Sequence, residues 1–189
     1  YYKMVKEKYI LETPQIISTV TPDVLDNILD RYVRHGLENN LFVSTTNKNI
    51  QFYAQSKKYS IYTLINDNNE VISATRVSQL GYRFNNKILI QPMISHKYSE
   101  SEKGSLLKLY SFIQKYLDCY MVSDREHSID AKEVWYKWLT NKSKYGIKNF
   151  WLFNNQTGEV SDESEIDNIE DIWGYEAKYR AYQIIIEFK

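Results

Sequence analysis

The residues best suited to proton transfer occur together in the segment 123–127, which reads Ser-Asp-Arg-Glu-His. This segment follows a predicted strand and precedes a predicted helix, and ligands in α/β sheets bind at that end of a strand. The carboxylate of Asp124 is therefore a candidate general base, and His127 a candidate base or substrate contact. Asp124 also suits a turn or a helix cap, because its short side chain accepts hydrogen bonds from nearby backbone N–H groups. The sequence leaves both interpretations of Asp124 open.

The other reactive side chains form no recognisable catalytic or metal-binding pattern. His35, His96 and His127 have no metal-ligand spacing with Cys119, the single cysteine of the chain. Cys119 lies in an apolar segment, which predicts a small, buried hydrophobic residue. There is no nucleophile elbow, Walker loop or dinucleotide-binding fingerprint. The sequence therefore predicts no metal site.

Residues 159–171 carry seven acidic side chains and neither lysine nor arginine. One interpretation is a solvated loop between the last two predicted strands. The other is a surface that attracts a basic protein partner or a cationic acceptor substrate through its negative charge. A protein inhibitor that uses this segment on a basic target is a third interpretation of the whole chain.

The length, charge and composition of the chain limit the classes of protein to which it can belong. The 189 residues are expected to form a single domain, 1–189, large enough to need no disulfide. The 24 basic and 24 acidic residues cancel, which argues against a dedicated nucleic-acid-binding protein. No apolar run approaches the ~18 residues of a membrane span. One cysteine excludes an intramolecular disulfide framework and fits a reducing compartment, so we expect a protein of the cytoplasm.

The chain is rich in tyrosine, with 17 residues of this type. Abundant Asn, Ile and Lys accompany them, and all four residue types have AT-rich codons, so an AT-rich genome is one explanation. An aromatic binding surface is the other. Composition alone does not decide between the two.

The first predicted helix begins at Thr21-Pro22, because threonine is a good cap and proline suits the first helical turn. Apolar residues then recur at helical spacing. Gly36, followed by Asn39-Asn40, is expected to end this helix.

Two further helices are predicted in the second half of the chain. Ser99 and Glu102 have capping-box spacing ahead of the first of them. Its apolar stripe consists of Leu106, Leu109, Tyr110, Ile113 and Leu117. Ser128 can cap the next helix, which is expected to turn Trp135 and Trp138 toward the core. A substrate platform is the alternative role for these two indole rings.

Strands are predicted where β-forming residues alternate or run together between turn signals. They cover residues 50–55, 59–66, 70–80, 87–95, 119–123, 149–153 and 179–188. Connections are expected at 67–69 and 81–86. Pro92 cannot donate to a strand ladder, so it predicts a bulge or a break in pairing within its strand.

The order of elements is therefore β, α, β, β, β, α, β, α, β, β. Two strands joined through a helix imply a parallel pair with a right-handed crossover. The preceding hairpin implies antiparallel neighbours. We expect an α/β (α+β) fold with a mixed central sheet and helices on both of its faces.

Three segments carry a resemblance to a known superfamily. They are YSIYTLINDNNEVISATRVSQL, KILIQPMISHKYSESEKGSLLKLYSFI and CYMVSDREHSIDAKEVWYKWL. In this order they resemble the GNAT acyltransferases, most strongly over residues 59–139. The chain also resembles small phage-encoded GNAT-like proteins through Leu109-Tyr110, Ser123-Asp124 and Trp135.

The resemblance implies a single GNAT-like domain that takes an acetyl group from acetyl-CoA and gives it to an amine. It places the pyrophosphate at the loop Lys97–Ser105, with Lys103, Gly104 and Ser105 at the start of a helix. Backbone groups from Ile90 to Ile94, including Gln91 and Met93, would hold the pantetheine arm.

The loop also departs from the pattern of the superfamily. Glu102 stands where the first glycine is expected, and Ser99 where a basic or amide residue is expected. Glu100 and Glu102 stabilise an empty helix start and repel a phosphate, and Lys97 and Lys103 offset that charge only in part. An ordinary capped helix is thus the alternative to a phosphate-binding loop.

The residue at the expected proton-donor position also differs from the superfamily's pattern. Trp135 stands where the superfamily often has a tyrosine that protonates the leaving thiolate. Indole cannot serve as this donor in the way that a phenol does. Tyr136 is adjacent, but it lies about 100° around the helix. Ser128 or a water molecule is the substitute acid, and Asp124 and Ser128 become the candidates for proton handling.

The sequence thus favours a GNAT-like N-acyltransferase that acts on a small-molecule or protein amine. The alternative is a GNAT-fold protein without catalysis, which binds a partner or builds part of a phage particle or a host-takeover complex. In either case a phage-encoded chain would reside in the host cytoplasm or in the virion.

Overall fold

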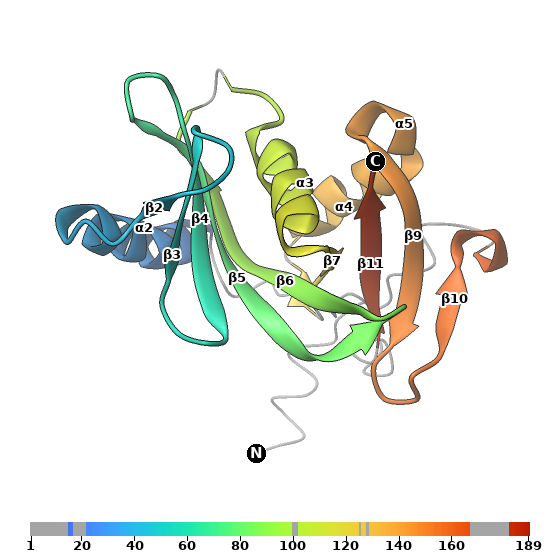
Figure 1. Cartoon of the computed structure of the whole chain (residues 1–189). Helices are drawn as coiled ribbons and strands as arrows, with labels where there is room; N and C mark the ends of the chain where they lie inside the picture. Colours follow the sequence, from blue (N-terminus) through green and yellow to red (C-terminus); the bar gives the residue numbers. More distant parts are fainter. Residues whose placement is uncertain (1–14, 17–21, 100–101, 125, 128, 167–181) are drawn as a thin grey trace, which may run out of the picture. The chain divides into compact units, whose positions relative to one another are not determined.

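The computed structural model describes residues 15–16, 22–99, 102–124, 126–127, 129–166 and 182–189. The chain has an α+β fold and divides into two compact units (Figure 1). We call residues 21–121 the central unit, and residues 1–20 with 122–189 the terminal unit.

The central unit is built on a mixed sheet. Its helices and strands are α2 (Pro22–Glu38), β2 (Val43–Ser44), β3 (Ile50–Ala54), β4 (Tyr59–Ile65), β5 (Val71–Phe84), β6 (Lys87–Lys97), α3 (Ser105–Leu117) and β7 (Cys119–Val122). The strands lie in the order β7-β6-β5-β4-β3-β2. Neighbours are antiparallel except β6 and β7, which α3 connects and which run parallel. The predicted parallel pair and its antiparallel neighbours are both confirmed.

Strands β5 and β6 form a long hairpin. The predicted connection at 81–86 is wrong in its extent, because β5 continues to Phe84 and only Asn85 and Asn86 form the turn. Both asparagines have positive φ, 46° and 64°. A two-residue turn with both central residues in this region matches the twist of the flanking strands, and asparagine tolerates it better than most residues.

Strand β6 contains a bulge next to its proline. Arg76 of β5 pairs with Ile94, and the next residue, Val77, pairs with Pro92, so Met93 has no residue opposite it. Proline lacks the N–H that a regular ladder would use at this point. The irregularity that Pro92 predicts is therefore confirmed.

Helices α2 and α3 cover opposite faces of this sheet. Leu29 and Val33 of α2 pack against Ile61 of β4 and Ala74 of β5. The neighbouring residue of β5, Thr75, points the other way, because side chains alternate along a strand. On that other face a chain of hydroxyl groups leads from Thr75 to α3. The expectation of helices on both faces is met in the central unit.

Helix α2 ends immediately before Asn39-Asn40, as expected, whereas Gly36 itself lies within the helix. The helix continues to Glu38, and Asn40 follows with φ at 52°. A Cβ atom on Gly36 would lie 2.5 Å from the Phe42 ring, closer than real contacts allow. The glycine therefore permits the chain to fold back against its own helix.

The predicted capping box before α3 is not formed. The cap position is Gly104, with φ at 79°, and no side chain caps the helix. Ser99 and Glu102 are instead joined through their backbones, since the Glu102 N–H donates to the Ser99 carbonyl. Of the predicted stripe, Leu109, Tyr110 and Ile113 are buried.

The terminal unit has its own strands and helices. They are β1 (Gln15–Ile16), β8 (Glu126–His127), α4 (Ile129–Thr140), α5 (Lys142–Tyr145), β9 (Ile147–Asn154), β10 (Val160–Asp162), η1 (Glu163–Glu165) and β11 (Tyr182–Phe188). Strand β9 pairs antiparallel with both β10 and β11, and β1 pairs parallel with β8. The predicted strands near the C-terminus correspond to β9 and β11.

Several predicted core residues are buried as expected. Trp135 and Trp138 are 8% and 7% exposed, and their ring centroids lie 5.4 Å apart. Cys119 is fully buried in β7. Among the described residues, no helix is long and apolar enough to cross a membrane.

Candidate functional site

One edge of strand β6 is only partly paired, and most of the predicted cofactor-binding residues lie along it. The parallel ladder with β7 joins Ile88–Ile90 to Cys119–Met121 and then stops, although β6 continues to Lys97. Ile90 therefore lies within the ladder, and from Gln91 to Ile94 this edge of β6 pairs with no strand among the described residues; we call this stretch the unpaired edge of β6. The bulge at Met93 falls on this unpaired stretch.

Helix α3 begins a few residues after β6, and its first turn has unused hydrogen-bond donors. The first helical bond is donated by the Lys108 N–H to the Gly104 carbonyl, 3.0 Å away. The preceding N–H groups, those of Leu106 and Leu107, have no acceptor among the described residues. The first turn of a helix leaves such groups free, and together with the helix dipole they favour an anion.

Ser105 adds a buried hydroxyl at the same place. Its side chain is 4% exposed, and its Oγ has no hydrogen-bond partner within the described part of the chain. A buried polar atom without a partner is costly, so it calls for an explanation such as a bound ligand or water. Gly104 supplies the left-handed turn that leads into this helix start.

The charges around the helix start are mixed. Lys103 and Glu102 are both exposed and form no ion pair among the described residues. Lys97 is partly buried at the end of β6. Glu100 lies outside the described residues. The helix start therefore presents one exposed lysine and one exposed glutamate next to its free N–H groups.

A chain of hydroxyl groups, which sequence reasoning missed, joins the sheet to α3. The Thr75 and Ser95 hydroxyls lie 2.7 Å apart, and Ser95 bonds to the Tyr110 hydroxyl on α3. Burial raises the pKa of Tyr110, although its hydrogen bond with Ser95 acts in the opposite direction. Thr75 and Ser95 lie opposite each other on neighbouring strands, and this register was not evident from the sequence.

The predicted proton-handling residues belong to the terminal unit. Ser123 is held to β11: its Oγ accepts from the Ile184 N–H at 2.9 Å, and its carbonyl accepts from the Gln183 side chain at 2.8 Å. Asp124 follows it and is partly buried. Tyr136 lies on α4 and is partly buried, whereas Ser128 falls outside the described residues. Only Asp124 and Tyr136 can therefore be placed.

His127 ends the two-residue strand β8 and has no described side chain. Within the described part of the chain, no group of three or more His, Cys, Asp or Glu residues is arranged to hold a metal ion. Burial, and then the charge of Asp118, raise the pKa of the Cys119 thiol to about 12, so it remains a neutral thiol. This state does not suit a nucleophile.

The described half of the acidic segment is not a plain solvated loop. Strand β10 pairs with β9, and the short helix η1 follows it. Glu163 forms an ion pair with Lys142, and the Asp162 carboxylate accepts from the Ser164 N–H. The Ser164 hydroxyl also donates to this carboxylate, and the hydrogen bonds from that hydroxyl and then from the N–H lower the pKa of Asp162. Residues 167–171 lie outside the described residues.

The predicted cofactor-binding residues all lie in the central unit, along β6, in the loop that follows it and at the start of α3. Asp124 and Tyr136 lie in the terminal unit. Compared with known proteins, the chain matches no family model and no curated protein. The functional argument therefore depends on the residues themselves.

Proposed function

We propose that the chain is a GNAT-like N-acyltransferase, which takes an acetyl group from acetyl-CoA and transfers it to an amine. One observation carries the proposal: β6 separates from its parallel partner at Ile90, and its unpaired edge leads toward a helix start with free donors. Such an edge offers backbone groups to the amide-rich pantetheine arm, and the helix start offers N–H groups to its pyrophosphate.

The donors at the helix start fit a phosphate group. The Ser105 hydroxyl and the N–H groups of Leu106 and Leu107 lack partners in the described chain, and Lys103 adds a positive charge beside them. The negative charge of Glu102 offsets the positive charge of Lys103. We therefore infer that phosphate binds this helix start more weakly than it would if Glu102 were uncharged.

In acyl transfer the amine attacks the thioester carbonyl, and the thiolate of coenzyme A leaves. Backbone N–H groups along the edge from Gln91 to Ile94 are the donors that would stabilise the oxyanion. Asp124 is the candidate base for the proton that the amine loses. Ser128, Tyr136 or water would return a proton to the thiolate.

A second function, binding without catalysis, is favoured by the aromatic residues. Trp135 is buried against Trp138, and its indole cannot protonate a thiolate. Tyr110 has its hydroxyl engaged by Ser95. A GNAT-fold protein that has lost catalysis would keep the architecture and act as a partner-binding module.

Calorimetric titration of the full chain with coenzyme A tests the proposal. We expect saturable binding, which Lys103→Glu weakens at least about tenfold and Glu102→Gln tightens severalfold, because these changes alter the charge at the helix start. Lys115→Glu is the matched control, since the same charge change at the far end of α3 should leave binding unchanged.

The absence of heat at millimolar coenzyme A would overturn the proposal. If coenzyme A binds the Lys103→Glu variant as tightly as the native chain, the cofactor binds elsewhere.

A second experiment separates the two functions: acetyl-CoA is incubated with a panel of amines and the released thiol is measured. Binding of coenzyme A without thiol release in any of these reactions would favour the non-catalytic alternative.

A further inference from the structure

Arg76 on β5 is held between two aromatic rings on the face of the sheet that α2 covers. Its Cζ lies 4.2 Å from the ring centroid of Tyr59 and 5.1 Å from that of Tyr32. Its Nε donates a 2.8 Å hydrogen bond to Oε1 of Gln55. Contacts from β4, α2 and the turn after β3 therefore fix the position of the guanidinium group. A cation over the face of a ring is stabilised, and more so when partly desolvated.

This arginine has no acidic partner. Arg76 is partly buried, yet its side chain forms no ion pair with the described residues and no hydrogen bond or ring contact beyond those just given. Other basic residues in the molecule do have carboxylate partners: Arg34, Lys87, Lys142 and Lys148. The charge of Arg76 is therefore left uncompensated in the described part of the chain.

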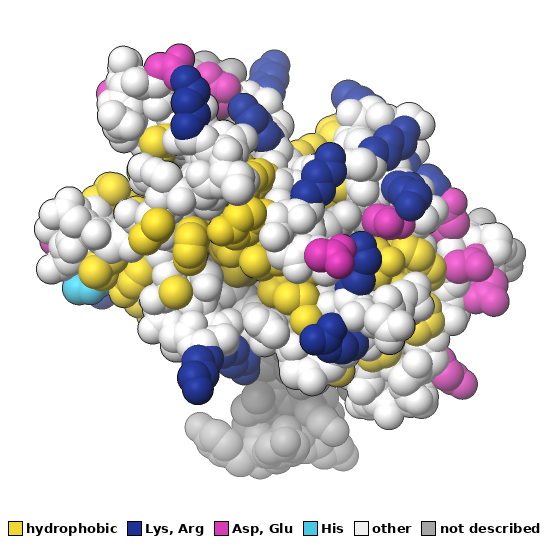
Figure 2. Space-filling view, in the orientation of Figure 1, with side chains coloured by type: hydrophobic (Ala, Val, Ile, Leu, Met, Phe, Trp, Pro, Cys, Tyr) yellow, Lys and Arg dark blue, Asp and Glu magenta, His cyan; other side chains and the backbone are white. Residues whose placement is uncertain are grey.

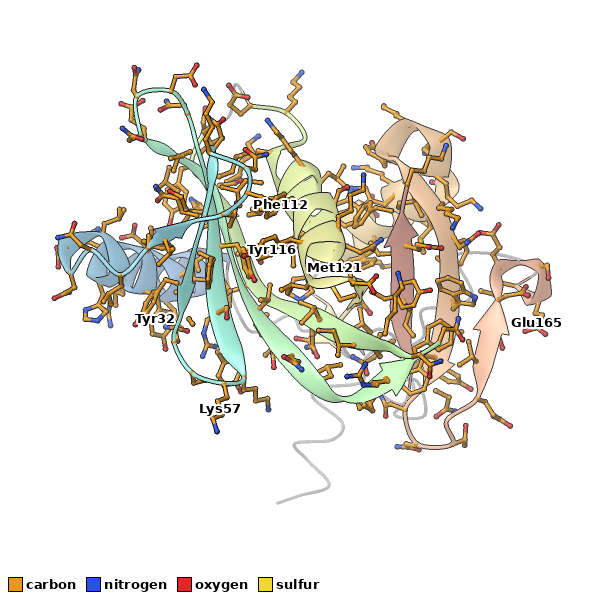
Figure 3. All side chains as sticks on the ribbon, in the orientation of Figure 1. Tyr32, Lys57, Phe112, Tyr116, Met121 and Glu165 are labelled. Carbon is orange, nitrogen blue, oxygen red and sulfur yellow. The ribbon has the colours of Figure 1, made fainter. Side chains whose placement is uncertain are left out.

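A second cation shares the ring of Tyr59. The Lys58 Nζ lies 5.3 Å from its centroid, and Lys58 likewise forms no ion pair with described residues. Lys57, labelled in Figure 3, precedes it at the turn between β3 and β4. Figure 2 shows blue side chains at this end of the molecule. Uncompensated like charges repel each other, and a bound anion would relieve that repulsion.

The unused hydrogen-bond donors match a phosphate group. Because only Nε is engaged, by Gln55, the Nη atoms of Arg76 remain as hydrogen-bond donors. The edge of a guanidinium binds two oxygens of one anion at once. The hydroxyls of Tyr32 and Tyr59 also lack hydrogen-bond partners in the described part.

We propose that Arg76 and Lys58, with Tyr32 and Tyr59 beside them, form a binding site for a phosphate group of a small ligand. A phosphate monoester carries close to two negative charges near neutral pH, which matches the two cations, whereas a carboxylate carries one. The site lies on the α2 face and α3 on the opposite face, so the inference goes beyond the proposed acyl transfer and does not depend on it.

The test is an NMR titration of the ¹⁵N-labelled full chain with inorganic phosphate, at constant ionic strength. We expect saturable shifts of the Arg76 side-chain Nε–H signal and of the Lys58 amide signal. In Arg76→Met the hydrophobic stem is kept and the donors are lost, so binding at the Lys58 amide should weaken at least about tenfold. In Lys58→Gln the loss should be severalfold, because a flexible lysine contributes charge without a fixed geometry.

Two controls make the result specific. Lys48→Gln removes a similar exposed lysine from the opposite end of β3, and phosphate binding at Arg76 should be unchanged. Acetate at the same ionic strength should produce far smaller shifts than phosphate. If acetate binds as tightly as phosphate, or if Arg76→Met binds phosphate as tightly as the native chain, the proposal is wrong. The same holds if the native chain shows no saturable shift.

The outcome is separable from that of the acyltransferase proposal. Lys103→Glu should leave phosphate binding at Arg76 unchanged. Because coenzyme A itself bears a phosphate monoester, the reverse comparison is made in an Arg76→Met background, where Lys103→Glu should still weaken coenzyme A binding. Loss of phosphate binding at Arg76 in the Lys103→Glu variant would show that the signal reports the helix start, and would overturn the inference drawn from Arg76.

Discussion

The two faces of the central sheet contain different kinds of buried side-chain cluster, one aliphatic and one of hydrogen-bonded hydroxyl groups. On the α2 face, Leu29, Val33, Ile61 and Ala74 form a buried aliphatic cluster, against which the rings of Tyr32 and Tyr53 pack. On the α3 face, hydroxyl groups of β5 and β6 join in a hydrogen-bonded chain that ends at Tyr110. The aliphatic cluster is stabilised by excluding water, whereas the hydroxyl chain must also satisfy its polar atoms.

The same contrast extends to titration. The α3 face carries a buried thiol, Cys119, whose Sγ lies 3.8 Å from the Ile113 carbonyl oxygen of α3. It also carries Tyr62, whose pKa burial raises to about 12, with a contribution from the nearby Tyr116 and Cys119. The cluster of Leu29, Val33, Ile61 and Ala74 contains no titratable group. We therefore expect the stability contributed by the α3 face to depend on pH and that of the aliphatic cluster to be independent of it.

The largest expected effect concerns the α2 face. Leu29→Ala should lower the free energy of unfolding by about 2–5 kcal/mol, because it deletes buried methyl groups and leaves a cavity. Urea unfolding followed by circular dichroism measures this change. The loss should be the same at pH 7 and at pH 10.5.

The neighbouring residue provides the control for this change. Ile28 is 37% exposed on the same helix, and Ile28→Ala should change stability by no more than about 0.5 kcal/mol. A loss for Leu29→Ala that varies with pH would contradict the contrast between the two faces.

An intermediate effect is expected at alkaline pH on the α3 face. The thiol of Cys119 has its pKa raised from 9.0 to about 12. Between these values the unfolded chain has released the proton and the folded chain keeps it, so stability falls as pH rises. The Cys119 thiol alone lowers the free energy of unfolding by about 1.4 kcal/mol per pH unit in this range, and Cys119→Ala should remove this slope.

The measurement is urea unfolding at pH values from 8 to 11. The readout is the slope against pH, so a constant loss of stability caused by the smaller alanine does not interfere with it. Tyr62→Phe should remove a second contribution that begins about one pH unit higher, because the ordinary pKa of tyrosine is 10.0. An unchanged slope in both variants would mean that neither Cys119 nor Tyr62 is the source of the alkaline loss.

Much of this architecture is predictable from the sequence, because it depends on local patterns. Hydrophobic periodicity placed α2, α3 and the strands β3 to β6, and the missing N–H of Pro92 predicted the bulge in β6. The crossover through α3 implied the parallel pair. Each of these inferences uses residues that are close together along the chain.

The features that escaped prediction depend on contacts between residues distant in sequence. Arg76 meets Tyr32 across 44 positions, and nothing in either local pattern indicates that encounter. Gly36 was taken as a helix stop because its local signal is a break, whereas its actual role depends on the ring of Phe42. In the candidate site, the unpaired edge of β6 depends on where the ladder with β7 ends, which single-sequence patterns do not determine.

The smallest expected effect isolates one hydroxyl on the α3 face. Tyr110→Phe removes the end of the hydroxyl chain, while Ser95 keeps its bond to Thr75, so we expect a loss of about 1 kcal/mol. Tyr116→Phe is the matched control: this tyrosine lies on the same helix, is 40% exposed, and should change stability by less than about 0.5 kcal/mol. Chemical unfolding at pH 7 compares the two. Equal losses would show that the buried hydroxyl contributes no more than an exposed one, because water would then satisfy Ser95 equally well when Tyr110 is replaced.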